Sequence, residues 1–450
     1  MKRKFMIGWI GIAVLLSTQA CTKVEKIKEP VTLKVWSWEG NYGDYATDFA
    51  GAHEGIRLVR VAPIDETNPM NGYDPEKMKQ RFEQTLQAIE ELQPDVLLLE
   101  IPQYIKLARE GKLASLEQRV KRKDFNEATY SPSLLTMLRI QGSDELYGLA
   151  DNLYSEAIYY NKTLLNKNQI PLPQSSMSWE ETLRLADRVS NTNAGIAGYF
   201  AGTDERTRAW AIISGIGMTS KLQYVNAKDK IVTIHTPAWA KIWQMVLDGY
   251  KSGAIIENTQ EMSVNRGGHN YYKPEDSYGL FLSGKAAMIK ASPGFKDILS
   301  EQKVGFEWGV VAEPSDPTLK EGISMQPLNI YAISAASPYK DEAWQLIDYL
   351  ISEERQKRQA AAVMSMGGLP ARIDANQGED SFIKPFVELP PSPEGQFVEF
   401  YRDDIPNSFI DSFSLLADAY FLKLLDGTLS VDEALKQLQE EAQAEFNKFK

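Results

Sequence analysis

The chain has 450 residues, a formal net charge of −12, 43% hydrophobic residues and 24% charged residues. This length exceeds what one hydrophobic core usually supports, so we expect at least two domains of ordinary globular composition. The acidic balance argues against nucleic acid as a partner, because nucleic-acid-binding proteins present a basic face.

The N-terminus has the order of an export signal. Basic residues 2–4 precede an apolar run over residues 5–16, which is too short to span a bilayer as a stable helix. Cys21, the only cysteine, follows the small residue Ala20. This arrangement resembles the cleavage site of bacterial lipoproteins, which implies a signal peptide over residues 1–20 and a lipidated Cys21. The alternatives are a secreted protein with a free thiol and an uncleaved N-terminal anchor.

A polar tether follows Cys21 and extends to residue 30. Beyond it, β-prone or continuous apolar runs alternate with apolar residues at helical spacing. This alternation predicts an α/β layer with parallel strands. The predicted strands cover residues 32–36, 56–61 and 95–99, and the predicted helices cover residues 46–53, 75–92 and 104–110.

The middle and the end of the chain are richer in helix. A Ser or Thr followed by Pro, or by Glu three residues later, marks a helix start. Such starts occur at Ser178, Thr236, Ser337 and Ser430. Short strands return late in the chain, which indicates a domain that the chain enters more than once. These late strands are predicted over residues 287–290, 308–311 and 330–334.

Five segments in order resemble the extracellular solute-binding proteins of bacterial ABC importers, in the family-one branch that includes maltose-binding protein. They include the strings PDVLLLE, YYNK, GKAAMIK and GGLPAR, and the resemblance extends from about residue 31 to about residue 372. The five segments are residues 94–117, 146–186, 284–295, 333–356 and 367–372.

The resemblance implies two α/β lobes, each a mostly parallel sheet flanked by helices, with a ligand cleft between them. Carried onto this sequence, the chain crosses between lobes near residues 147–152, near 305–308 and near Ser334. The first lobe then comprises residues 31–149 and 306–333, and the second lobe comprises residues 150–305 and 334–450. Open parallel sheets bind ligands beyond the carboxyl ends of their strands, which agrees with this layout.

The expected ligand contacts follow strand ends and crossings. Trp38, Glu39 and Asn41 follow the first strand, where the resemblance implies a ligand-binding loop. Glu100 ends a buried strand, and it either binds ligand hydroxyls or caps the next helix. The first crossing supplies Asp151, Asn152 and Tyr154, whose alternative role is hydrogen bonding within the hinge.

Four further candidates lie later in the chain. Phe295 lies near a position where the family often has a Trp that stacks on sugar, and Asn329 precedes the third expected crossing. Trp210 either binds ligand or fills the core of a helix. Arg372 either binds a ligand oxygen or pairs with a surface acid.

Catalytic motifs are not evident. The three histidines are far apart, and the chain has no HExxH, GxSxG or phosphate-binding loop. We therefore expect no catalytic residue, no metal and no cofactor, and a binding function in place of enzyme activity. The resemblance implies a monomeric, extracytoplasmic substrate-binding protein that is anchored to the cell membrane by Cys21. It delivers a carbohydrate of oligosaccharide size to an ABC permease. The alternatives are a peptide- or polyamine-binding protein, a ligand-presenting partner of a sensor, and an enzyme on the same scaffold.

Overall fold

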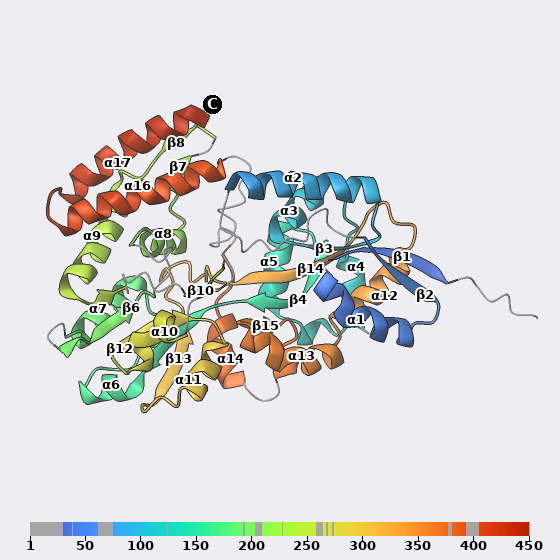
Figure 1. Cartoon of the computed structure of the whole chain (residues 1–450), viewed down its shortest axis with the longest axis horizontal. Helices are drawn as coiled ribbons and strands as arrows, with labels where there is room; N and C mark the ends of the chain where they lie inside the picture. Colours follow the sequence, from blue (N-terminus) through green and yellow to red (C-terminus); the bar gives the residue numbers. More distant parts are fainter. Residues whose placement is uncertain are drawn as a thin grey trace, which may run out of the picture.

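The computed structural model describes residues 30–37, 39–61, 75–123, 125–191, 194–202, 209–226, 228–257, 264–266, 269–271, 274–376, 380–392 and 405–449. The expected signal peptide, Cys21 and the tether up to residue 29 lie outside these ranges. None of the helices within them is both long and apolar enough to cross a membrane. Two helix-flanked sheets lie next to each other along the long axis of the molecule (Figure 1).

The first sheet is mixed, with parallel strands on one side and antiparallel strands on the other. β1 pairs in parallel with β2 and β3, whereas β14 runs antiparallel to both β3 and β4. The sequence predicts mostly parallel strands; β14 runs the other way because the chain enters it from the second sheet. The order is β15 (Gly368–Pro370), β4 (Gly148–Tyr154), β14 (Gln326–Ile333), β3 (Val96–Leu99), β1 (Val31–Trp36) and β2 (Ile56–Val61).

The second sheet is also mixed. β12 pairs in parallel with β6, which pairs in parallel with β9, while β5 runs antiparallel to β12 and β13. Its order is β13 (Trp308–Ala312), β5 (Ala157–Asn161), β12 (Ala286–Ala291), β6 (Ala197–Phe200) and β9 (Ile255–Ile256). Two short antiparallel pairs lie outside it: β7 (Val225–Asn226) with β8 (Ile231–Val232), and β10 (Val264–Arg266) with β11 (His269–Tyr271).

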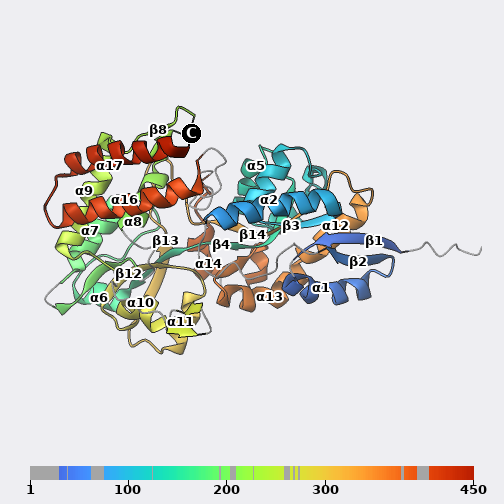
Figure 2. The same ribbon diagram turned by 45° about the horizontal axis from the view of Figure 1, so that its top comes forward.

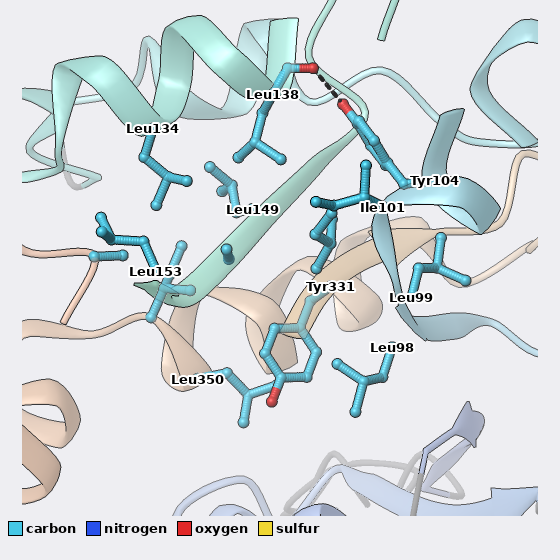
Figure 3. Packing of buried hydrophobic residues seen from close by; sticks show 14 of the residues in the cluster. Leu98, Leu99, Ile101, Tyr104, Leu134, Leu138, Leu149, Leu153, Tyr331 and Leu350 are labelled. Carbon is cyan, nitrogen blue, oxygen red and sulfur yellow. Dashed lines mark hydrogen bonds between the residues drawn. The ribbon is translucent and has the colours of Figure 1, made fainter. Parts of the chain in front are cut away.

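Helices cover both faces of the first sheet, as the expected α/β class requires. One face packs against α1 (Glu39–Ala52), α12 (Lys340–Leu350) and α13 (Glu353–Ser365). The other face packs against α3 (Ile101–Arg109) and α5 (Pro132–Gln141), with α2 (Pro75–Leu92) and the short α4 (Glu117–Val120) nearby (Figure 1). Leucines fill the space between sheet and helices, and Tyr331 points toward Leu350, away from Leu134 and Leu138 (Figure 3).

The second sheet carries a thicker helical layer. Helices α16 and α17 stack over α8 and α9 on its outer side (Figure 2). The elements on this side are α7 (Trp179–Val189), α8 (Ala209–Thr219), α9 (Pro237–Ser252), α16 (Asn407–Leu425) and α17 (Val431–Phe446). The remaining helices of this lobe are α6 (Lys162–Lys167), α10 (Pro274–Leu282), α11 (Phe295–Glu301) and α14 (Asp380–Val387).

The chain crosses between the two sheets at positions that differ from two of the three expected ones. The first crossing follows β4, since Tyr154 ends that strand and Ala157 begins β5 in the second sheet. β13 belongs to the second sheet, so the second crossing lies between residues 312 and 326 and not near 305–308.

The prediction of a third crossing near Ser334 is wrong. After β14 the chain continues into α12 and α13, which pack on the first sheet, and then into β15, which pairs with β4. It returns to the second sheet only through α14, which packs against β13. Residues 334–370 therefore belong with the first sheet and residues 308–312 with the second. Sheet membership depends on pairing between distant strands, which local sequence patterns do not encode.

Three of the four expected helix caps are confirmed. Ser178, Thr236 and Ser430 each accept a hydrogen bond from a backbone N–H in the first turn of α7, α9 and α17. Ser337 is different, because its hydroxyl donates to Asp95 Oδ1 at 2.6 Å and α12 begins only at Lys340. A distant buried carboxylate thus displaces the local capping pattern.

Candidate functional site

Three expected site residues lie at the same level on neighbouring strands of the first sheet. Ile330 of β14 pairs with Leu99 of β3 and with Ala150 of β4. One residue further along each antiparallel ladder, Glu100, Asn329 and Asp151 therefore lie side by side. This is the sheet edge at which β1 and β3 end and from which β4 continues toward the second sheet. The edge therefore faces the space between the two lobes.

Asp151 is held by two neutral donors on β14. The Asn329 amide donates to Asp151 Oδ1 at 3.3 Å, and the Tyr331 hydroxyl donates to Oδ2 at 3.2 Å. Burial raises the pKa of the Asp151 carboxyl from its ordinary 3.8 to about 7, although both hydrogen bonds and the positive charge of Arg355 act to lower it. The group therefore exchanges its proton near neutral pH.

Asn329 has a backbone conformation that few residues adopt. Its φ of 52° lies in the left-handed region, which asparagine tolerates better than most other residues. The ladder pairs on either side of it are Leu328 with Asn152 and Ile330 with Ala150. This local turn of the strand places the Asn329 amide against Asp151 and leaves its side chain partly exposed.

Behind Asp151 lies a layer of buried polar residues from the helices of the same face. The guanidinium of Arg355, from α13, lies over the rings of Tyr45 and Tyr349, 5.9 and 5.8 Å from their centroids. Tyr45 and Arg355 are both buried. An aromatic face attracts a cation electrostatically, so these rings hold the guanidinium near the carboxyl without a direct ion pair being required.

Asn152 has a buried acceptor atom. Its Oδ1 atom is buried and receives no hydrogen bond from the described part of the protein. A buried polar atom normally has a partner, because leaving it without one costs about 1–3 kcal/mol. Asn152 is adjacent to Asp151 and paired with Leu328, so the unpartnered atom belongs to the same region of β4.

Glu100 combines two properties at the end of β3. Its side chain is exposed, and its backbone N–H donates to Gln103 Oε1 at 2.8 Å in the first turn of α3. Desolvation by the surrounding protein raises the pKa of its carboxyl, partly offset by Arg81. Glu100 is also the N-cap residue of α3, as the capping alternative predicts.

Tyr154 lies at the far end of β4. It is partly buried, and its hydroxyl donates to Glu156 Oε1 at 2.9 Å. It therefore links the strand that carries Asp151 and Asn152 to the segment that crosses to the second sheet. The hydrogen bond fits the expected alternative of a hinge contact as well as a ligand contact.

Two aromatic candidates lie in the core and not at this edge. Trp210 is 6% exposed and packs among Tyr224, Trp239 and Phe413 in the helical layer of the second lobe. Phe295 is 1% exposed, and its ring contacts Tyr159, Tyr278 and Phe281. Side chains this well covered have no surface to present to a ligand, so the core alternative holds for Trp210 and the stacking role of Phe295 is wrong.

Arg372 is a third candidate that is buried. Its Nε donates to the Ile351 carbonyl at 2.9 Å, and one terminal nitrogen donates to the Asn126 carbonyl at 3.0 Å and the Thr129 hydroxyl at 2.7 Å. The guanidinium also lies 4.8 Å from the centroid of the Phe125 ring. Arg372 thus ties together segments of the first lobe, which corrects both the ligand role and the surface ion pair.

The candidates after the first strand are only partly described. Trp38 lies outside the described residues, and so do the side chains of Glu39 and Asn41. The backbone shows that Glu39 and Asn41 form the first turn of α1 and not a loop. Tyr42, Tyr45 and Phe49 recur at helical spacing in α1, and this signal predicts a helix start earlier than residue 46.

The sequence patterns miss Tyr331, Tyr45 and Arg355. Arg355 is, with Gln356 and Ala360, one of the buried residues of α13. A charged residue on the buried face of a helix signals a polar partner inside. No cluster of three or more His, Cys, Asp or Glu suited to a metal occurs among the described residues.

The chain is similar in sequence to known binding proteins. A chain from Brucella abortus described as a binding protein is 24% identical over 67% of this chain, and the galactooligosaccharide-binding protein of Bacillus subtilis is 23% identical over 62%. The match spans 62% of the length of each of these relatives.

Solved structures show the same fold. The sugar-binding protein MalE from Xanthomonas citri superposes with a TM-score of 0.62 at 17% identity, covering 93% of this chain and 98% of that one. A family 1 extracellular solute-binding protein from Alicyclobacillus acidocaldarius gives a TM-score of 0.66 at 15% identity, covering 93% and 99%. Both confirm the two-lobed α/β class.

The family is shown by a match that covers most of the chain. Residues 45–386 fit the family described as bacterial extracellular solute-binding protein. The expected resemblance is thereby confirmed, and this protein belongs to the bacterial extracellular solute-binding proteins.

Proposed function

We propose that this protein is the lipid-anchored substrate-binding component of an ABC importer, and that it captures a carbohydrate, of oligosaccharide size, between its two lobes. The observation that carries the proposal is the row formed by Glu100, Asn329 and Asp151 at the edge facing the second sheet. Binding between lobes joined by a few crossing segments proceeds by hinge closure around the ligand.

The chemistry of this edge suits a neutral polyhydroxylated ligand. Carboxylates accept hydrogen bonds from hydroxyl groups, amides both accept from them and donate to them, and the unpartnered Asn152 Oδ1 is one further acceptor proposed for a ligand. Relatives and structural neighbours include a galactooligosaccharide-binding protein and a protein in complex with cycloalternan. Trp38, Glu39 and Asn41 remain proposed contacts at the end of β1.

A cationic ligand such as a polyamine, or a peptide, is the alternative that the acidic residues allow. The environment of Asp151 favours sugar over a cation. Two neutral donors already occupy its carboxyl, and the buried Arg355 supplies positive charge nearby. A cation placed beside them would meet that positive charge, whereas a sugar hydroxyl would not.

Anchoring and delivery complete the proposal. The extracellular family places the work of the protein outside the cytoplasm. Cys21 after a short apolar run supports a lipid anchor at the cell membrane, and the closed lobes would then dock on the permease. The protein binds and releases its ligand unchanged, with no catalytic step.

A thermal-shift screen of the protein carrying Cys21→Ser tests the ligand class. Neutral oligosaccharides, polyamines and short peptides are added in turn, and a ligand at about 100 times its Kd stabilises by roughly 2.7 kcal/mol. We expect an oligosaccharide to raise the melting temperature and Asp151→Asn to weaken that shift, while Lys251→Ala, an exposed control on α9, leaves it unchanged.

Other outcomes would contradict the proposal. Stabilisation by polyamines alone, abolished by Asp151→Asn, would establish the cationic alternative. Conversion of an added sugar into product would show an enzyme. The anchor is tested separately by mass analysis of the full chain from membranes and by membrane retention of the Cys21→Ser variant. No added mass at Cys21, together with a Cys21→Ser protein that is retained as firmly as the unaltered chain, refutes lipidation at Cys21.

A further inference from the structure

A second polar cluster, outside the candidate site, lies where the crossing segments meet. Glu156 belongs to the first crossing, between β4 and β5, and Glu313 and Ser324 belong to the second, between β13 and β14. The segment after α14 joins them, because the Gly322 N–H donates to the Pro390 carbonyl and the Ser392 N–H donates to the Gly322 carbonyl, both at 2.8 Å. Two crossing segments and the segment that follows α14 thus come together at this point.

Lys290, on β12 of the second sheet, connects this cluster. Its Nζ atom lies 3.0 Å from Glu156 Oε2 and donates to Ser324 Oγ at 3.3 Å. The Ser324 hydroxyl in turn donates to Glu313 Oε2, and the backbone N–H groups of Ile323 and Ser324 donate to Glu313 Oε1 at 2.8 and 2.9 Å. One ammonium group therefore contacts the first crossing directly and the second through a serine.

The cluster is partly buried and carries opposite charges. Glu313 is 6% exposed, and the side chains of Lys290 and Glu156 are 16% and 21% exposed. Burial raises the pKa of the Glu313 carboxyl. Burial alone would lower the pKa of the Lys290 ammonium, but the carboxylates of Glu156 and Glu313 outweigh it and the pKa is raised. Lys290 is therefore charged at every physiological pH.

The same crossing carries the candidate ligand residues. Tyr154 donates to Glu156 Oε1, and it lies on the strand that bears Asp151 and Asn152. Movement of the first crossing relative to Lys290 would displace this strand and stretch the ion pair. Because Coulomb attraction between partly buried charges falls with distance and is weakly screened, such a displacement is opposed.

We propose that Lys290 is a positioning residue that sets the angle between the two lobes, and so the balance between open and closed forms, without touching the ligand. The proposal rests on the proposed function only in that closure accompanies binding. Lys290 acts through the segments that it joins. Its removal should loosen the lobes relative to each other while each lobe keeps its own fold.

The test compares interlobe distances in the absence of ligand, so it does not depend on the identity of the solute. Spin labels are placed at Arg109→Cys on α3 and Lys251→Cys on α9, two exposed positions in different lobes, in the full chain carrying Cys21→Ser. Pulsed dipolar spectroscopy then gives the distance distribution for the parent, for Lys290→Met and for Lys290→Arg.

We expect Lys290→Met to shift or broaden the distribution, and Lys290→Arg, which keeps the charge, to restore most of it. The matched control is Lys285→Met, an exposed lysine directly before the same strand, which should leave the distribution unchanged. A distribution for Lys290→Met that is the same as that of the parent overturns the proposal, whether or not the protein binds sugar.

A folding failure would not end the test. If Lys290→Met does not fold, the double variant Lys290→Met/Glu156→Gln removes both charges of the pair and relieves the uncompensated carboxylate. A folded double variant with a broadened distribution supports the proposal, and one with the parent distribution contradicts it. A parent protein that binds no sugar would refute the proposed function, and the comparison of interlobe distances would still stand.

Discussion

The protein compensates two sets of carboxylates differently: Asp151 in the first sheet, and Glu156 and Glu313 in the two crossing segments. Asp151, in the first sheet, accepts hydrogen bonds from a neutral amide and a phenol, with Arg355 further away. Glu156 and Glu313 flank the ammonium of Lys290. With neutral donors, the pKa of Asp151 stays near 7, where a bound ligand can shift it. An ammonium fixes both charge and geometry, which suits a joint.

The largest expected effect is the loss of unfolding free energy when Lys290 is replaced. Lys290→Met leaves the buried Glu313 and the partly buried Glu156 without their cation, and breaking a fully buried pair costs about 3–5 kcal/mol, which is an upper bound here. We expect urea denaturation to show a loss of unfolding free energy of that order, against about 0.5 kcal/mol or less for Lys285→Met. Equal small losses in both variants would show that the ammonium does not hold the joint.

The pH dependence of stability should single out Asp151. Its folded pKa, about 7, lies above its ordinary 3.8, so the protonated form is favoured by folding. The stability from this group is complete below pH 4 and is lost as the pH rises through about 7, with a slope of up to roughly 1.4 kcal/mol per pH unit.

Asp151→Asn, which has no proton to lose, should remove that slope. Unfolding free energies of both proteins between pH 4 and pH 8 provide the measurement, with Lys290→Arg as a control whose profile stays parallel to the parent. Parallel profiles for the parent and Asp151→Asn would contradict a raised pKa at this carboxyl.

Substitutions of Asn329 test how far its backbone conformation contributes to the hydrogen bonding of Asp151. Asn329→Ala removes one donor, worth about 1 kcal/mol, and places a side chain that disfavours the left-handed region at φ 52°, for about 1 kcal/mol more. Asn329→Gly removes only the donor, so we expect it to lose about half as much stability. If glycine destabilises as much as alanine in chemical denaturation, the backbone contribution is absent.

The smallest effect comes from Tyr331→Phe. It removes one hydroxyl donor to Asp151 Oδ2, for about 0.5–1.5 kcal/mol, and it should raise the pKa of Asp151 further because that hydrogen bond acts to lower it. Carboxyl-carbon NMR titration of Asp151 measures the shift. A lowered pKa in the variant would mean that the hydroxyl does not donate to the ionised carboxyl.

Local patterns in the sequence predict most elements, and they fail where distant segments decide the outcome. Ser178, Thr236 and Ser430 cap the expected helices, and α2 spans the expected residues 75–92. The placement of β13 in the second sheet depends on pairing with β5, more than a hundred residues earlier. No local signal contains that pairing.

The candidate site divides in the same way. Glu100, Asp151 and Asn329 are predictable because strand ends and crossings place polar residues at a sheet edge. Trp210 and Phe295 are not, since a large aromatic residue suits a core and a ligand platform equally well in sequence. Arg372 is bound to backbone carbonyls from other segments, and nothing near it in the chain indicates those partners.

The strand order of the first sheet has a consequence for how the chain folds. β14 lies between β3 and β4, yet it follows β4 by the whole length of the second sheet. Leu97 and Leu98 therefore cannot find their final neighbours on β14 until the chain is available to at least Ala332. Such non-local pairing gives a high contact order and slow folding. A chain that completes this sheet so late stays unfolded for longer than one whose strands pair with near neighbours.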